Sequence, residues 1–489
     1  MQTRIFFITG SLLLLAGVTG CKKVIERVPD SVLTTAQYFK NAKDIDLAVI
    51  GVYSSYQSRK QTDYMLLELP TDNLYRSNYT LAAGADDMDN LSITPSNPLL
   101  STFWSASYAG IARANAVLSN IDNPGDYKTG QKEQFTGEAK FMRALFYFDL
   151  VRLFGGVPAV TSQLSIDEAK NLPRASEEEI YTLIINDLKE AAGLLPDKAS
   201  IAKGRASNGA AAALLAKVYV YRKDWPNAKT YLDQVNGMGY GLLPSFANIW
   251  KLDNEDNNEM VFVMKYVEGT NGQTLSSAYL PFGGIAGIAT SGNESAFPSW
   301  DLLKLYDEND SRKAATIESY YQAPTPANAP LAWLPHVSKY QVKHVINSSG
   351  LDLPVIRYAD LVLLMAEVQY GLQHPDLAVA EINKIRERAF GSSDHNYTVA
   401  DISTDADFTD KLLLERRLEL AYENERWFDL VRTNRLLTDL SVEERSYNIA
   451  TETAQTVALA PKANYSLLPV PQTQIDIYPT DVLTQNPGY

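Results

Sequence analysis

The stretches AAALLAKVYVYRKDWPNAKTYLDQV (residues 211–235) and LVLLMAEVQYGLQHPDLAVAEINKI (residues 361–385) decide the fold. When they are aligned, Ala216 falls on Ala366, and a second pair of alanines coincides further along. Small residues on two successive helices let the helices approach closely, and the apolar positions that follow pack the second helix against the first. A proline-containing turn separates the two halves of each stretch. This register is typical of tetratricopeptide-like hairpins, although two unrelated amphipathic hairpins would also fit it.

Further helices are expected around these hairpins. Apolar residues recur at helical spacing in residues 101–121, 138–154 and 410–432. The segment 138–154 is apolar nearly all round, which predicts burial among neighbouring helices. A looser third copy of the hairpin starts in this segment and resumes, after a long insertion, near Ile184.

Two segments have a different, loop-like texture. Residues 73–100 and 239–354 are rich in glycine, proline, asparagine and serine, with one strand expected over 259–266. Long irregular insertions on a regular frame are common places for binding. We therefore expect a mostly α fold, a tetratricopeptide-like scaffold with little β structure, in a single domain over 21–489. Its helical frame is expected at about residues 30–72, 101–235 and 355–489.

The amino terminus predicts export and lipidation. Residues 1–20 contain an early Arg4 and an apolar run, and they end on small residues before the only cysteine, Cys21. This layout is typical of a secretory signal peptide with a lipobox. The apolar run is shorter than the ~20 residues that span a bilayer, although a short membrane helix with an incidental cysteine is the alternative. We expect Cys21 to carry acyl chains and to tether the protein to a membrane.

The composition argues against several classes of partner. Fifty-eight acidic residues outnumber 44 lysines and arginines, which gives the 489-residue chain a net charge of −14. A surface of that sign disfavours nucleic acid and a polybasic membrane patch. Because Cys21 is the only cysteine, the fold has no internal disulfide to rely on.

The motif search does not favour an enzyme. The four histidines lack the spacing of a zinc hydrolase, and neither a nucleophile elbow nor a P-loop occurs. Asp86, Asp87 and Asp89 are close in sequence but lack the rest of a calcium loop. We therefore expect no catalytic residue, no metal and no cofactor. The acidic and basic residues interleaved over 410–432 are expected to form ion pairs along one helix.

The two loop-like segments contain candidate ligand-binding residues. Small-molecule sites commonly combine aromatic planes with polar, hydrogen-bonding side chains. Most aromatic residues of the chain are expected to fill the scaffold. The candidates are Tyr75, Arg76, Tyr79, Tyr279, Phe282 and Trp333.

Four separated motifs resemble the SusD/RagB family of Bacteroidetes. They are RALFYFDLVRLFGGVP (143–158), GRASNGAAAALLAKVYVYRKDWPNA (204–228), LLLERRLELAYENERWFDLVRT (412–433) and the ending LLPVPQTQIDIYP…LTQNPGY (467–489). The resemblance spans essentially the whole chain in order. It implies a tetratricopeptide scaffold with an irregular ligand-binding face, in a lipid-anchored nutrient-binding protein of the outer membrane.

The resemblance also implies a partner and an orientation. The partner is a TonB-dependent transporter of the SusC type, over which the lipoprotein would sit as a lid. Outward exposure rests on the resemblance, because lysines rather than acidic residues follow Cys21. The expected function is capture of an oligosaccharide and its delivery, unaltered, to the transporter. The alternatives are a peptide or glycopeptide receptor of the RagB type and a structural scaffold that holds partner proteins.

Overall fold

The computed structural model describes residues 38–77, 82–441, 444–457 and 459–489, so the expected signal peptide and Cys21 lie outside the described residues. Helices dominate these residues, and the short strands pair into two-stranded sheets. The predicted mostly α fold is confirmed. Within the described part of the chain, no helix combines the length and the apolar character needed to cross a bilayer.

Both predicted hairpins are present. The first consists of α9 (Asn208–Tyr221) and α10 (Trp225–Asn236), and the second of α14 (Tyr358–Gly371) and α15 (Pro375–Phe390). The second helix of each hairpin carries proline in its first turn. The alanines of the aligned positions are fully buried, as close helix approach requires: Ala216, Ala228, Ala366 and Ala378.

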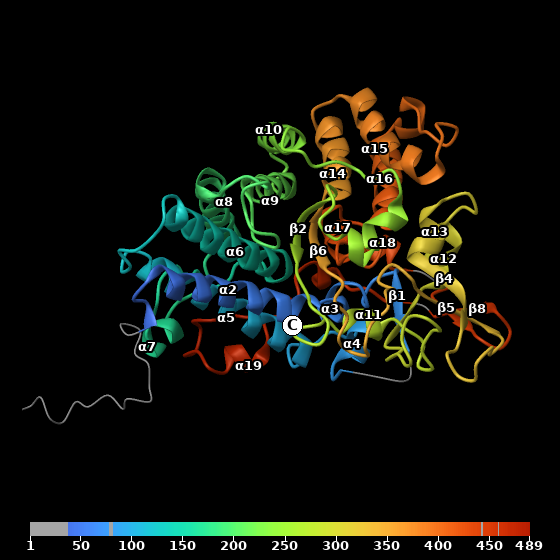
Figure 1. The fold of residues 1–489 in the computed structure, drawn as a ribbon, viewed down its shortest axis with the longest axis horizontal. Coiled ribbons are helices and arrows are strands. Elements are labelled where there is room, and N and C mark those ends of the chain that lie inside the picture. Colours follow the sequence, from blue (N-terminus) through green and yellow to red (C-terminus); the bar gives the residue numbers. More distant parts are fainter. Residues whose placement is uncertain (1–37, 78–81, 442–443, 458) are drawn as a thin grey trace, which may run out of the picture.

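The amino-terminal helices form the other half of the frame. Helix α6 (Gln131–Phe154) packs against α2 (Ala42–Lys60), α5 (Pro98–Asn120) and α8 (Glu177–Leu194). Nearly every side chain in the second half of α6 is buried, as the apolar pattern predicts. The contact between α6 and α8 confirms the looser third hairpin. Figure 1 shows the helices following one another in an arc across the molecule.

The single helix expected over 410–432 is wrong, because the chain forms α16 (Asp405–Leu420) and α17 (Arg426–Arg432) instead. Between them, Tyr422 and Asn424 adopt the left-handed region, with φ of 68° and 70°. This turn directs the Tyr422 ring, only 1% exposed, into the core. Burial of side chains therefore outweighs helical continuity here.

The loop-like segments hold short elements, most of which lie on the right-hand side of Figure 1, whereas β2 lies near its centre. The strand expected over 259–266 is β2 (Met260–Met264), which pairs with β6 (Leu353–Arg357). The other strands are β1 (Leu74–Arg76), β3 (Ala296–Pro298), β4 (Ile317–Gln322), β5 (Leu331–Val337), β7 (Ser446–Asn448) and β8 (Thr453–Gln455). The short α-helices are α3 (Tyr64–Leu67), α4 (Ala85–Asp89), α7 (Ile166–Lys170), α11 (Leu275–Ala278), α12 (Trp300–Leu305), α13 (Arg312–Thr316), α18 (Leu436–Asp439) and α19 (Gln472–Ile475).

The charges of α16 and α17 mostly form pairs between distant segments, not the pairs along one helix that the spacing suggests. Glu419 contacts Arg357 at 2.6 Å, and Glu415 contacts Arg312 at 2.6 Å. Both carboxylates are fully buried, and Arg357 also holds Glu259 at 2.6 Å. These contacts join the helical frame to the segment that carries β2 and β6. The expected local pairing is confirmed for Asp429 and Arg432, which contact at 2.8 Å on α17. It is wrong for Glu415 and Glu419, because these side chains point into the core, where their partners come from other elements.

Candidate ligand-binding site

An aromatic cluster forms where three strand pairs meet. Its members are Tyr75, Phe297, Trp300, Trp333 and Tyr447, supplied by β1, β3, α12, β5 and β7. The Tyr447 ring lies at the centre, with its centroid 5.2 Å from those of Tyr75 and Trp333 in edge-on contacts. Edge-to-face contacts of this kind stabilise aromatic pairs. The cluster therefore holds its rings in fixed orientations.

Backbone pairing brings the cluster together. Strands β1 and β3 are antiparallel, and their register places Tyr75 opposite Phe297. The Trp300 amide donates to the Arg445 carbonyl at 3.0 Å, which fastens the start of α12 to the segment leading into β7. The Tyr447 hydroxyl donates to the Pro335 carbonyl of β5 at 2.8 Å. Because burial raises the pKa of Tyr447, this hydroxyl stays protonated at neutral pH.

A surface groove of about 320 Å³ runs beside the cluster. Tyr75, Phe297 and Tyr447 supply its aromatic side, and Arg76, Asp89 and Arg445 supply polar groups. Its volume lies at the lower end of the range for small-molecule sites. Aromatic planes beside hydrogen-bonding side chains are the combination that a sugar ring requires.

The polar side of the groove is held by Asp89. Its carboxylate accepts the Arg76 backbone amide at 3.1 Å and pairs with the Arg445 guanidinium at 2.8 Å. Arg445 is 1% exposed, and it also donates to the Leu69 carbonyl at 2.6 Å. Burial raises the pKa of Asp89 and lowers that of Arg445, while each charge opposes the shift of the other. The Arg76 side chain pairs with Asp86 of α4 and remains partly exposed.

The structure brings together three of the six residues proposed from the sequence. Tyr75 and Arg76 line the groove, and Trp333 packs behind it against Tyr447. Tyr279 lies in the core, 2% exposed, with its ring stacked on Tyr340. Phe282 is 57% exposed on the loop before β3, outside the groove lining described here. Tyr79 lies outside the described residues.

Sequence reasoning missed Phe297, Tyr447, Asp89 and Arg445. Asp89 was considered only as part of an acidic loop, although it pairs with Arg445 across the groove. Tyr447 lies in a part of the chain that the hydrophobic pattern assigns to the frame. The strand SYN that carries it lies between Arg445 and Ile449, and its three residues are too few to show an alternating pattern.

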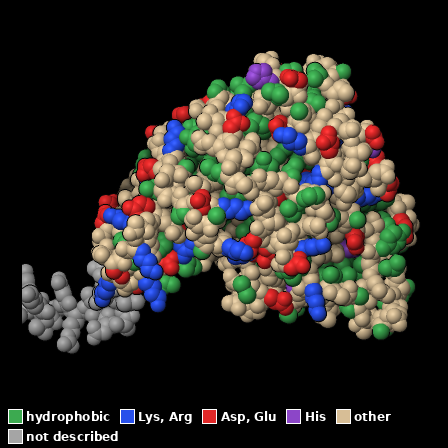
Figure 2. All heavy atoms as spheres, turned by 45° about the horizontal axis from the view of Figure 1, so that its top comes forward, with side chains coloured by type: hydrophobic (Ala, Val, Ile, Leu, Met, Phe, Trp, Pro, Cys, Tyr) green, Lys and Arg blue, Asp and Glu red, His purple; other side chains and the backbone are tan. Residues whose placement is uncertain are grey.

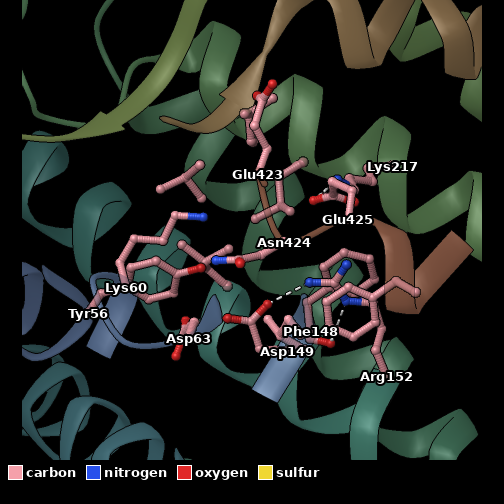
Figure 3. A pocket seen from close by; sticks show the side chains of 16 residues that line it. Tyr56, Lys60, Asp63, Phe148, Asp149, Arg152, Lys217, Glu423, Asn424 and Glu425 are labelled. Carbon is pink, nitrogen blue, oxygen red and sulfur yellow. Dashed lines mark hydrogen bonds and ion pairs between the residues drawn. The ribbon is translucent and has the colours of Figure 1, made fainter. Parts of the chain in front are cut away.

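Two other hollows are less suited to a sugar. The pocket in Figure 3 is enclosed by α2, α6, α9 and the turn before α17. Its volume of about 30 Å³ has room for roughly one or two water molecules. Its charged side chains largely pair with one another, as Lys217 does with Glu425 at 2.7 Å. A shallow hollow of about 520 Å³ beside β4 has one aromatic side chain in its lining, the buried Trp250.

The outer surface and the acidic loop add two observations. Figure 2 shows acidic and basic side chains interspersed over the face that it presents. Among the described residues, no group of three or more histidine, cysteine, aspartate or glutamate side chains is arranged to hold a metal ion. Asp86 and Asp89 have arginine partners instead.

The structure is a frame of helical hairpins with an aromatic groove, and comparison with known proteins identifies its family. The sequence model of the SusD family matches residues 335–489. A second model, described as "Starch-binding associating with outer membrane", matches residues 25–220. The chain belongs to the SusD/RagB family.

Individual relatives match over most of their length. SusD-like protein P2 of Formosa agariphila is 26% identical over 98% of this chain and 98% of its own length. SusD-like protein P38 of the same organism is 28% identical over 88% of this chain and 91% of its own length. A solved structure entitled "Laminarin binding SusD-like protein" is 25% identical, with a TM-score of 0.75 over 92% of this chain and 100% of that one.

Proposed function

We propose that this protein is a glycan-binding lipoprotein of the outer membrane that captures oligosaccharides in the aromatic groove. The observation that carries the proposal is the convergence of Tyr75, Phe297 and Tyr447 beside polar side chains in one groove. Sugar rings pack their C–H faces on such aromatic planes while their hydroxyls bond to the polar edge. The family relationship supports the same ligand class, because one similar structure is named for laminarin binding.

Tyr75 and Arg76 act as the first contacts, with Trp333 behind them as support. The Tyr75 ring offers a half-buried apolar plane, and Arg76 offers guanidinium donors at its side. Trp333 fixes the Tyr447 ring rather than lining the groove itself. Phe282 and Tyr79 remain candidates for contacts with a longer glycan, since their segments adjoin β3 and β1 in the sequence. The protein captures the glycan without altering it.

The same proposal includes the anchor and the partner. Acyl chains on Cys21 hold the protein at the outer membrane, facing the exterior, and a SusC-like TonB-dependent transporter receives the glycan. The family supports this arrangement, as does the lipobox ahead of Cys21. We expect Cys21→Ala protein to leave the membrane fraction in cell fractionation. Cys21→Ala protein that stays in the membrane fraction would contradict the lipid anchor.

The binding test compares two tyrosines on different strands. Tyr75→Ala removes an aromatic plane of the groove and should weaken glycan binding at least about tenfold in calorimetry. Tyr320→Ala is the matched control, because Tyr320 is 51% exposed on β4 and outside the described groove lining. A thermal melt of each variant checks its fold. Equal effects of the two variants would refute the groove, and binding of peptides but no glycan would favour the peptide-receptor alternative.

A further inference from the structure

The charged side chains of the groove are already paired with one another. Among the described residues, the lining contains three charged side chains, those of Arg76, Asp89 and Arg445. Arg445 pairs with Asp89 at 2.8 Å, and Arg76 pairs with Asp86 of the neighbouring helix α4. These two arginines and two aspartates sum to no net charge.

A lysine close to the groove in the described part of the chain is also paired. Lys304, on α12 near the cluster, pairs with Glu444 just before Arg445. The undescribed residues that adjoin the groove in sequence, 78–81 and 442–443, include no lysine or arginine. The net charge of −14 adds a long-range repulsion of anions.

We infer that the groove selects neutral oligosaccharides and rejects glycans that carry carboxylates or sulfates. The inference rests on the proposed glycan-binding function and narrows its substrate class. An anionic sugar would have to displace Asp86 from Arg76, or lose its own hydration without gaining a counter-charge. Leaving a charge unpaired at an interface is costly, whereas hydroxyls accept and donate to a paired arginine and aspartate alike.

The Arg76–Asp86 pair is the element that sets this preference. The Arg445–Asp89 pair is buried and locked by carbonyl acceptors, so its guanidinium is not available to a ligand. The Asp86 side chain, in contrast, is 53% exposed and that of Arg76 is 21% exposed. Substituting Asp86 therefore exposes one cation at the groove without disturbing the core.

The test compares neutral hexasaccharides of glucose, mannose and galactose with the same hexasaccharides oxidised to carboxylates at C6. Calorimetry on the wild-type protein should give at least about tenfold weaker binding for each oxidised form than for its neutral parent. In Asp86→Asn protein, the ratio of the Kd of the oxidised form to the Kd of its neutral parent should shrink about threefold or more. Binding of the oxidised forms should then weaken as salt is raised, because it depends on an exposed ion pair.

The matched control is Asp87→Asn, on the same turn of α4. It makes the same change in net charge, but Asp87 is 3.4 Å from the Asn97 amide and is not the partner of Arg76. In Asp87→Asn protein, the ratio of the two Kd values should equal that of the wild-type protein. Oxidised forms that bind wild type as tightly as their parents, or equal ratios in the two variants, would overturn the inference. Failure of every neutral and oxidised glycan to bind would instead overturn the proposed function itself.

Discussion

At the scale of single residues, His336 is a histidine buried in the interior behind the aromatic cluster. Its ring is 1% exposed, and Nδ1 donates to the Leu334 carbonyl at 2.7 Å. The other nitrogen, Nε2, is buried with no hydrogen-bond partner among the described residues. Burial lowers the pKa of His336 to about 4. The folded protein therefore holds this imidazole neutral at pH values where an unfolded chain protonates it.

Because the pKa of His336 differs between the folded and unfolded states, the free energy of unfolding should depend on pH in a definite direction. Between pH 6.5 and pH 4 the unfolded state binds a proton at His336 that the folded state does not, so stability falls as pH falls. His336→Phe should remove about 2 kcal/mol of the loss between pH 7 and pH 5. Urea denaturation at the two pH values measures the difference. An unchanged slope in His336→Phe would contradict the burial of a neutral ring.

The residues of the candidate site were only partly predictable. Tyr75 and Arg76 stand out in the sequence, because an aromatic ring next to a guanidinium in a loop is an uncommon pairing of chemistries. Phe297 and Tyr447 carry no such signal, since antiparallel pairing between distant segments leaves no periodic trace in either. Tyr279 has the same local appearance as Tyr75, yet packing against Tyr340 buries it. Burial of a loop aromatic depends on what the fold places over it.

At the scale of elements, the close approach of α5 and α6 depends on Gly110. A Cβ atom at this position would lie 2.2 Å from the Phe146 ring, which is itself fully buried. Real side chains do not approach so closely, so one of the two helices would have to shift. Gly51, within the neighbouring helix α2, has no atom within 4 Å of its would-be Cβ.

These two glycines predict opposite effects of the same substitution. Gly110→Ala should lower the free energy of unfolding by about 1–3 kcal/mol, through overpacking against Phe146. Gly51→Ala should raise it by up to about 1 kcal/mol, because alanine is the better helix former. Chemical denaturation of both variants measures the change. Stabilisation by Gly110→Ala would mean that α5 and α6 are not packed as described.

The elements themselves were well predicted where periodicity is strong. The alanine register of residues 211–235 and 361–385 specifies two hairpins, and both are present. The expected continuous helix over 410–432 is interrupted, because Tyr422 and Asn424 adopt positive φ although neither is glycine. Such backbone conformations are uncommon for these residues and depend on tertiary contacts that a local pattern does not contain.

At the scale of the whole molecule, buried ion pairs fasten the segment that carries β2 and β6 to the helical frame. Arg357, at the end of β6, contacts Glu259 beside β2 and both Glu419 and Glu423 near the end of α16. Its side chain is 1% exposed. The arrangement joins three regions that are far apart in the sequence.

Removing the Arg357 side chain should therefore lower the free energy of unfolding substantially. Arg357→Met leaves buried carboxylates without a partner and should lower the free energy of unfolding by about 3–5 kcal/mol. Lys304→Met breaks a pair whose two side chains are each 48% exposed, and it should change the free energy by no more than about 1 kcal/mol. Chemical denaturation at neutral pH compares the two. Similar small losses would contradict the idea that the buried pairs hold the two regions together.

The central claim is that a helical frame presents an aromatic groove that grips a glycan, and one measurement tests it most directly. That measurement is a crystal structure of the protein with the oligosaccharide that binds most tightly in calorimetry. The account predicts a sugar ring packed on the partly exposed ring of Tyr75, with hydroxyls bonded to Arg76 or Asp89. A glycan bound elsewhere, with this groove left empty, would contradict it.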